Sequence, residues 1–189
     1  MFATILLAGC AGDAQSISYA DHGKAASDGP MKEDSLPARQ DGNAAMGRDL
    51  FRFETFGNEG FWTDAVRMPQ GMKAAQVTPL RALKLGLSVD ADALDGATRS
   101  ALAQQLKADP SGNSSSILND PAATATLIND NAIIGMPIKD TNGDGVLDVN
   151  KGDKVGVSCA LCHTTTDGSV FSMPNGGSVG HRLDGRPSG

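Results

Sequence analysis

The stretch Cys159-Ala160-Leu161-Cys162-His163 decides how the rest of this 189-residue chain is interpreted. On one helical turn, residues i, i+3 and i+4 lie on the same face, so both thiols and the imidazole would point in one direction. Two cysteines at this spacing, with a histidine directly after the second, form the attachment motif of c-type haem. The motif predicts thioether links from Cys159 and Cys162 and an iron bond from His163.

Two other chemistries use the same residue types. A zinc site would need a further ligand, usually from a second Cys/His pair, and elsewhere the sequence offers Cys10, His22 and His181 at unrelated positions. A thioredoxin-like dithiol would follow a strand of a βαβ unit, and no such pattern precedes Cys159. Haem attachment is therefore the favoured interpretation of the motif.

Composition sets broad limits on the function. Hydrophobic residues make up 40% of the chain, enough for a core, while 23 glycines and 9 prolines indicate many loops. The formal net charge of −6 disfavours nucleic acid as a partner. An acidic surface instead favours a transient complex with a basic redox partner protein.

The N-terminus indicates export. Residues 1–10 end in Leu7-Ala8-Gly9-Cys10, which resembles the lipobox of bacterial lipoproteins, so we interpret them as a signal and lipobox segment with lipid on Cys10. The apolar part is shorter than that of a normal signal peptide and lacks its basic start, so the alternatives are a cut-down ordinary signal peptide or an apolar tail. Residues 11–43 are rich in small and polar side chains and are expected to form a disordered tether. The predicted location is periplasmic, at a bacterial membrane.

Residues 44–189 are expected to form the folded haem domain. Capping and proline signals predict short helices over 47–57, from Thr78-Pro79, over 97–107 and from Asp120-Pro121. No alternating strand pattern is present. The predicted fold is therefore mainly α, cytochrome c-like, with short helices and long loops around the haem-binding turn. Five of the eight aromatic residues lie between Phe51 and Trp62, and we expect them to form a core or one wall of a haem pocket.

A second motif, Asp140 to Asp148, resembles the first half of a calcium-binding EF-hand loop. Its candidate ligands are the side chains of Asp140, Asn142, Asp144 and Asp148 and the carbonyl of Val146. The acid usual at position 12 is replaced by Lys151, and Asp153 is the nearest substitute. The alternative is an ordinary polar turn, since Asn-Gly and Asp-Gly are turn dipeptides.

Three segments together carry a family resemblance: 51–62 (FRFETFGNEGFW), 159–164 (CALCHT) and 180–185 (GHRLDG). They are similar to those of exported bacterial c-type cytochromes with a single haem and poorly defined function. The resemblance spans about residues 45–185. Members of this family extend beyond the point that corresponds to Gly189, so the resemblance implies an N-terminal fragment.

The predicted function is covalent haem binding and electron transfer, with iron cycling between two oxidation states. Met173 is the favoured sixth iron ligand on this chain and His181 a second candidate, although the resemblance places the ligand more readily beyond Gly189. If the sixth position is open, the chain would instead be a peroxidase-like or oxidase-like haem enzyme subunit. A third alternative is a calcium-binding surface lipoprotein without haem, in which Cys159 and Cys162 form a disulfide.

Overall fold

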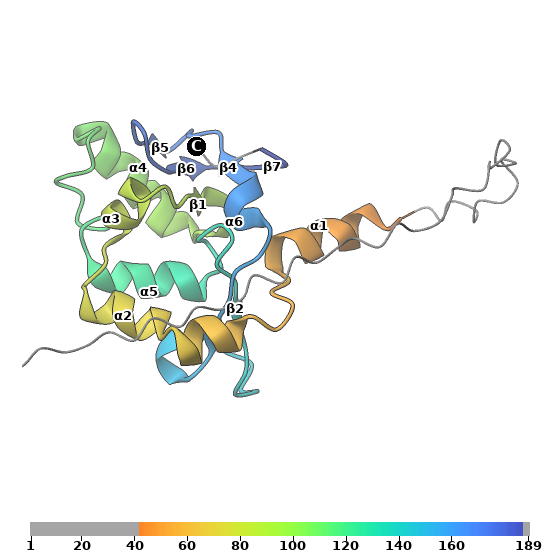
Figure 1. Ribbon diagram of the computed structural model, residues 1–189. Helices are drawn as coiled ribbons and strands as arrows, with labels where there is room; N and C mark the ends of the chain where they lie inside the picture. Colours follow the sequence, from red (N-terminus) through yellow and green to blue (C-terminus); the bar gives the residue numbers. More distant parts are fainter. Residues whose placement is uncertain (1–41, 187–189) are drawn as a thin grey trace, which may run out of the picture. The chain divides into compact units, whose positions relative to one another are not determined.

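The computed structural model describes residues 42–186. The signal and lipobox interpretation of residues 1–10, Cys10 included, lies outside this range, as do residues 11–41 of the tether predicted over 11–43. Asn43, at the end of that predicted tether, caps the first helix with its side chain. The helices, shown in Figure 1, are α1 (Ala44–Phe53), α2 (Met68–Ala74), α3 (Pro79–Lys84), α4 (Gly96–Ala108), α5 (Pro121–Asn129) and α6 (Ala160–His163), with single turns η2 (Phe61–Ala65), η3 (Ala91–Ala93) and η4 (Val149–Lys151).

Side-chain caps start most of these helices where the sequence predicts. Thr78 accepts a hydrogen bond from the Arg81 N–H at the start of α3, and Pro79 follows it at the first helical position. Asp120 caps α5 in the same way, again with a proline next in the chain. These residues satisfy N–H groups that have no partner within the helix. The predictions for α3, α4 and α5 are confirmed, whereas the first helix begins and ends earlier than predicted, at Ala44 and Phe53.

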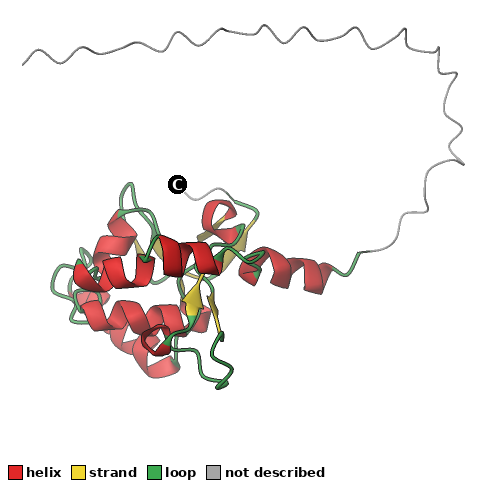
Figure 2. Ribbon diagram, turned by 60° about the horizontal axis from the view of Figure 1, so that its bottom comes forward, coloured by secondary structure: helices red, strands yellow, loops and turns green. Residues whose placement is uncertain are grey.

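The strands are very short: β1 (Val89–Asp90), β2 (Ile138–Lys139), β3 (Lys154–Val155), β4 (Thr164–Thr166), β5 (Phe171–Ser172), β6 (Ser178–Gly180) and β7 (Arg182–Asp184). The central strand β6 pairs in parallel with β1 and antiparallel with β5. The hairpin-like pairs β2–β3 and β4–β7 are both antiparallel. Figure 2 shows the short strands lying among the helices.

The prediction of a mainly α, cytochrome c-like fold is wrong. Helical residues make up 43% of the described chain and strand residues 12%, and the strands form three small sheets. A strand of two or three residues is too short to show an alternating pattern in the sequence. These strands also come from distant segments, as in the pairing of Val89 with Val179, so no local hairpin signal marks them.

The core is aliphatic and joins the helices to the central sheet. Its buried side chains come from α3, α4, α5 and the strands, and include Leu80, Leu83, Val89, Leu102, Leu106, Leu127, Ile128, Ile133, Val155, Phe171 and Val179. The aromatic cluster 51–62 was expected in a core or a pocket wall, but Phe53, Phe56 and Phe61 are exposed. No helix within residues 42–186 is both long and apolar enough to cross a bilayer.

Candidate haem-binding turn

The predicted haem-binding residues form one exposed helical turn. Cys159 has helical backbone angles and directly precedes α6, which contains Cys162 and His163. Both cysteines and the histidine are exposed, whereas Ala160 is fully buried on the opposite side. The turn therefore presents two sulfur atoms and one imidazole to solvent and packs its small residue against the body of the protein. This is the arrangement that the i, i+3, i+4 spacing predicts.

Gly135 holds the buried side of this turn. Its carbonyl accepts a hydrogen bond from the Ser158 N–H at 3.1 Å. Its φ of +78° lies in the left-handed region, and a Cβ at this position would lie 2.2 Å from the backbone N and Cα of Leu161. No other residue type fits both the conformation and the space. The loop before β2 and the helix α6 thus meet backbone to backbone.

The segment after α1 holds the loop that leads into the turn. The Ser158 hydroxyl donates to the Arg52 carbonyl at 2.8 Å, where α1 approaches its end. The Asn58 side chain binds both backbone groups of Val157, its Oδ1 accepting from the N–H at 2.8 Å and its Nδ2 donating to the carbonyl at 2.7 Å. Asn58 and Ser158 fix the entry into α6, and sequence reasoning gave neither of them a role.

The strand that follows the turn is held from the other side. β4 begins at Thr164, directly after His163, and pairs with β7. The Thr164 hydroxyl donates to Asp184 at 3.1 Å, and the same carboxylate forms an ion pair with Arg52. The three segments that carry the family resemblance, 51–62, 159–164 and 180–185, therefore meet around α6.

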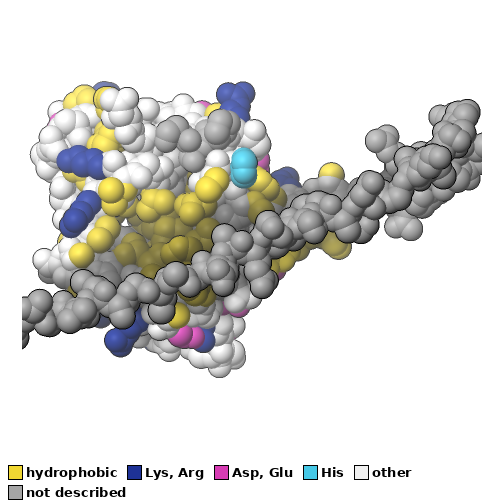
Figure 3. Space-filling model, viewed as in Figure 1, with side chains coloured by type: hydrophobic (Ala, Val, Ile, Leu, Met, Phe, Trp, Pro, Cys, Tyr) yellow, Lys and Arg dark blue, Asp and Glu magenta, His cyan; other side chains and the backbone are white. Residues whose placement is uncertain are grey.

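An apolar surface lies beside the turn. Figure 3 shows hydrophobic side chains gathered in the middle of the face that Figure 1 draws, in the region between α6 and the helices α3 and α5. Leu161 itself is half-buried and packs against the core. Two thiols and an imidazole next to an apolar surface fit a porphyrin, which needs thioether partners, an iron ligand and shelter from water.

The two candidate sixth ligands have other contacts. Met173 is half-buried against the core, and its turn is tied to α3 by a hydrogen bond from the Gly177 N–H to the Leu83 carbonyl at 2.7 Å. His181 is exposed, with its Nδ1 2.9 Å from a carboxylate oxygen of Asp92. The hydrogen bond and negative charge of Asp92 raise the pKa of His181. The structure thus places Met173 against α3 and gives His181 a carboxylate partner.

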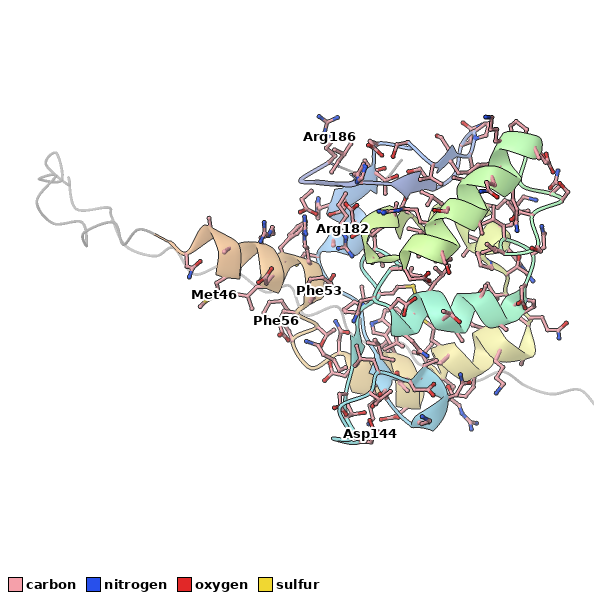
Figure 4. All side chains as sticks on the ribbon, turned by 180° about the vertical axis from the view of Figure 1, so that it is seen from behind. Met46, Phe53, Phe56, Asp144, Arg182 and Arg186 are labelled. Carbon is pink, nitrogen blue, oxygen red and sulfur yellow. The ribbon has the colours of Figure 1, made fainter. Side chains whose placement is uncertain are left out.

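The candidate calcium loop binds its own backbone. Asp140 accepts hydrogen bonds from the N–H groups of Gly143 and Gly145, Asn142 accepts from Asp144, and Asp144 accepts from Val146. Figure 4 shows Asp144 near the tip of this loop, away from α1. The loop therefore has an ordered shape of its own.

The acids at the end of this loop are also engaged. Asp153 is buried and accepts from the N–H groups of Thr141 and Asp148, and these hydrogen bonds lower its pKa. Asp148 caps η4 by accepting from the Asn150 N–H, which lowers the pKa of Asp148. Asp153 thus joins the two ends of the loop through these hydrogen bonds.

Two further findings bear on other ligands. Within residues 42–186, no three His, Cys, Asp or Glu side chains gather in a group that could hold a metal ion. A cavity of about 730 Å³ lies between α2, α5 and η4. Its lining includes Met72, Lys73, Ile128 and Val149, and none of the residues of the haem-binding turn.

The chain was compared with family models, curated proteins and solved structures. No family model matches the chain, and no match was found among curated proteins or solved structures. The resemblance noted from the three segments therefore stays a prediction, and the function has to be argued from the chemistry of the residues.

The contact between Gly135 and Leu161 gives a direct test of how the turn is held. Gly135→Ala should lower the free energy of unfolding by about 3 kcal/mol or more, because overpacking costs about 1–3 kcal/mol and a left-handed alanine about 1–2 kcal/mol. Chemical denaturation measures this loss. Gly185→Ala is the matched control, since Gly185 also has a positive φ but nothing within 4 Å of an added Cβ. An equal loss in both variants would show that the contact contributes nothing.

Proposed function

We propose that this chain binds haem c covalently through Cys159 and Cys162, with His163 as the proximal iron ligand, and that it transfers electrons. The observation that carries the proposal is the single helical turn with these three side chains exposed together and Ala160 buried behind them. A structural CxxC pair or a core histidine would instead be expected to face the interior. The proposed setting is the bacterial periplasm, where haem c is attached to exported chains.

The chemistry divides between the cofactor and the chain. Haem iron supplies the one-electron change between its ferrous and ferric states. The chain supplies a fixed site. Gly135 packs against the buried side of the turn, and Ser158 fixes the residues that precede it. The apolar surface beside α6 would keep water from one side of the cofactor. Firm attachment matters because a site whose ligands shift between the two oxidation states transfers electrons slowly.

Charge supports a transient partner of opposite sign. The chain carries a formal net charge of −6, and complementary charge raises the rate at which two proteins meet. The proposed partner is a basic redox protein. The proposed membrane contact is lipid on Cys10, since two or more acyl chains on one residue give stable anchoring.

A haem enzyme with an open sixth iron position is the second candidate function. The observation that favours it is the engagement of both candidate ligands, Met173 against α3 and His181 with Asp92. A bound peroxide or oxygen would need such a position on the iron. The number of protein ligands on iron therefore separates an electron carrier from an enzyme.

Covalent attachment is the first test. The protein is produced together with haem-maturation proteins, and the pyridine haemochrome spectrum is recorded. Two saturated thioether links give a characteristic band, and the haem should remain with the protein in acid–acetone. Cys162→Ala should abolish normal attachment, whereas the exposed Val146→Ala should not. Haem that extracts freely from the parent protein would refute the proposal and favour a lipoprotein without haem.

The sixth ligand is the second test. We expect the reduced protein to bind carbon monoxide readily, because Met173 packs against the core and His181 is paired with Asp92. Met173→Ala should leave the spectrum and the carbon monoxide affinity unchanged within about twofold. Optical titration measures both. A low-spin parent with a sulfur-to-iron band in the near infrared, lost in Met173→Ala, would instead establish methionine ligation and a complete electron carrier.

Calcium at the loop Asp140–Asp148 is a separate proposal, supported by the ordered backbone and the oxygen-rich side chains. If the dissociation constant is near 0.1 mM, then 1 mM calcium should stabilise the protein by about 1.4 kcal/mol and raise Tm by about 3–6 °C. Asp144→Ala should remove the rise, and Asp49→Ala, on the exposed surface of α1, should keep it. No rise in the parent protein would rule out this site.

A further inference from the structure

Helix α1 has an apolar stripe that stays partly exposed to solvent. Met46, Leu50 and Phe53 recur at helical spacing along it and are 60%, 46% and 37% exposed, and α1 contains no buried residue. Phe56, directly after the helix, is 77% exposed. Figure 4 shows the labelled side chains of Met46, Phe53 and Phe56 on the same side of α1.

The stripe forms one side of a groove. A cavity of about 430 Å³ runs along it, lined by Asn43, Ala45, Met46, Asp49, Leu50, Phe53, Glu54 and Lys139. The last turn of α1 is tied to the body through the Ser158–Arg52 hydrogen bond, the Arg52–Asp184 ion pair and the Phe53 ring, which lies against the Arg182 guanidinium. Figures 1 and 2 both show the rest of α1 projecting from the body.

A short helix with an exposed apolar stripe is unfavourable when water surrounds it on all sides. A ten-residue helix is marginal by itself, and a contiguous apolar patch on a soluble protein marks a site of interaction. Met, Leu and Phe on one face, with basic residues such as Arg48 and Arg52 on the other, are typical of helices that lie in a membrane interface. The stripe therefore has the composition of a helix face that contacts such an interface.

The charges around the stripe are balanced. Arg48 and Asp49 lie 3.8 Å apart, Glu54 pairs with Lys139 at 3.6 Å, and Arg52 pairs with Asp184. The net charge of −6 resides elsewhere on the chain. Balanced charge neither attracts the stripe to an anionic surface nor repels it from a zwitterionic one, so apolar contact decides what it binds.

We propose that the apolar stripe of α1 (Met46, Leu50, Phe53 and Phe56) lies on the lipid membrane and inserts into its interface. The inference rests on the proposed lipid anchor at Cys10. The 33 steps from Cys10 to Asn43 can span at most about 110 Å. The anchor therefore keeps α1, the first described helix, at high local concentration near the bilayer.

A second copy of the chain fits the stripe less well. A stable interface buries about 800 Å² on each partner, and three turns of helix with four apolar side chains supply only part of that area. Two copies would also each carry the same net negative charge, which opposes association. Weak insertion into a bilayer needs no such area, because the lipid anchor already holds the domain in place.

The test uses the full haem-loaded chain with Cys10→Ser, which removes the anchor and isolates α1. Hydrogen exchange of the amides in residues 44–53 is measured with and without vesicles of phosphatidylcholine at several millimolar lipid. We expect exchange to slow at least threefold with vesicles. Met46→Glu with Leu50→Glu should abolish the slowing, and Val66→Glu with Leu85→Glu, at two exposed apolar residues outside α1, should not.

The outcomes separate the proposals. Unchanged exchange with vesicles would overturn the insertion of α1. Slow exchange without vesicles that depends on protein concentration would show that a second copy covers the stripe, and would also overturn it. A parent chain that carries no lipid on Cys10, as read by mass spectrometry, would refute the anchor while vesicle binding by the Cys10→Ser chain still tests the stripe.

Discussion

The backbone contact between Gly135 and Leu161 is the constraint on which the candidate site depends. A helix of four residues cannot be stable by itself, because it closes too few hydrogen bonds to offset the cost of fixing its backbone. α6 holds its shape because it is packed from behind so closely that Gly135 leaves no room for a Cβ against Leu161. The loop 133–137 is in turn fixed to the core, where Ile133 and Met136 are buried. This loop therefore fixes the two thiols and the imidazole of α6 relative to the aliphatic core.

Polar contacts complete what this packing begins. Asn58 and Asp184 bind Val157 and Thr164, on either side of α6, and Ser158, just before α6, donates to the Arg52 carbonyl. Behind them, the guanidinium of Arg182 is nearly buried, paired with Asp90 and covered by the ring of Phe53. A buried charge of this kind needs its partner, so Arg182 ties β7 to β1.

The sequence predicted local features, such as helix caps, better than the contacts between distant segments. Caps at Thr78 and Asp120 could be found because their signal lies within four residues. The spacing of Cys159, Cys162 and His163 likewise predicts that their side chains share one face of a helical turn. The strands could not, since two-residue pairs such as Val89 with Val179 have no periodicity. The role of Asn58 was also out of reach, because its partner Val157 lies 99 residues away. The exposure of Phe53 and Phe56 could not be predicted either, as aromatic residues usually indicate a core.

The bonds that fix α6 have a consequence for the order in which the protein acquires its structure. Ser158 is bound to Arg52 across 106 residues and Thr164 to Asp184 across 20. Contacts of large sequence separation form late, because they close large loops. We expect the segment 157–164 to stay extended and accessible while the aliphatic core assembles. A modifying enzyme that must reach both thiols would have its best opportunity during that interval, before β7 closes over the strand that follows His163.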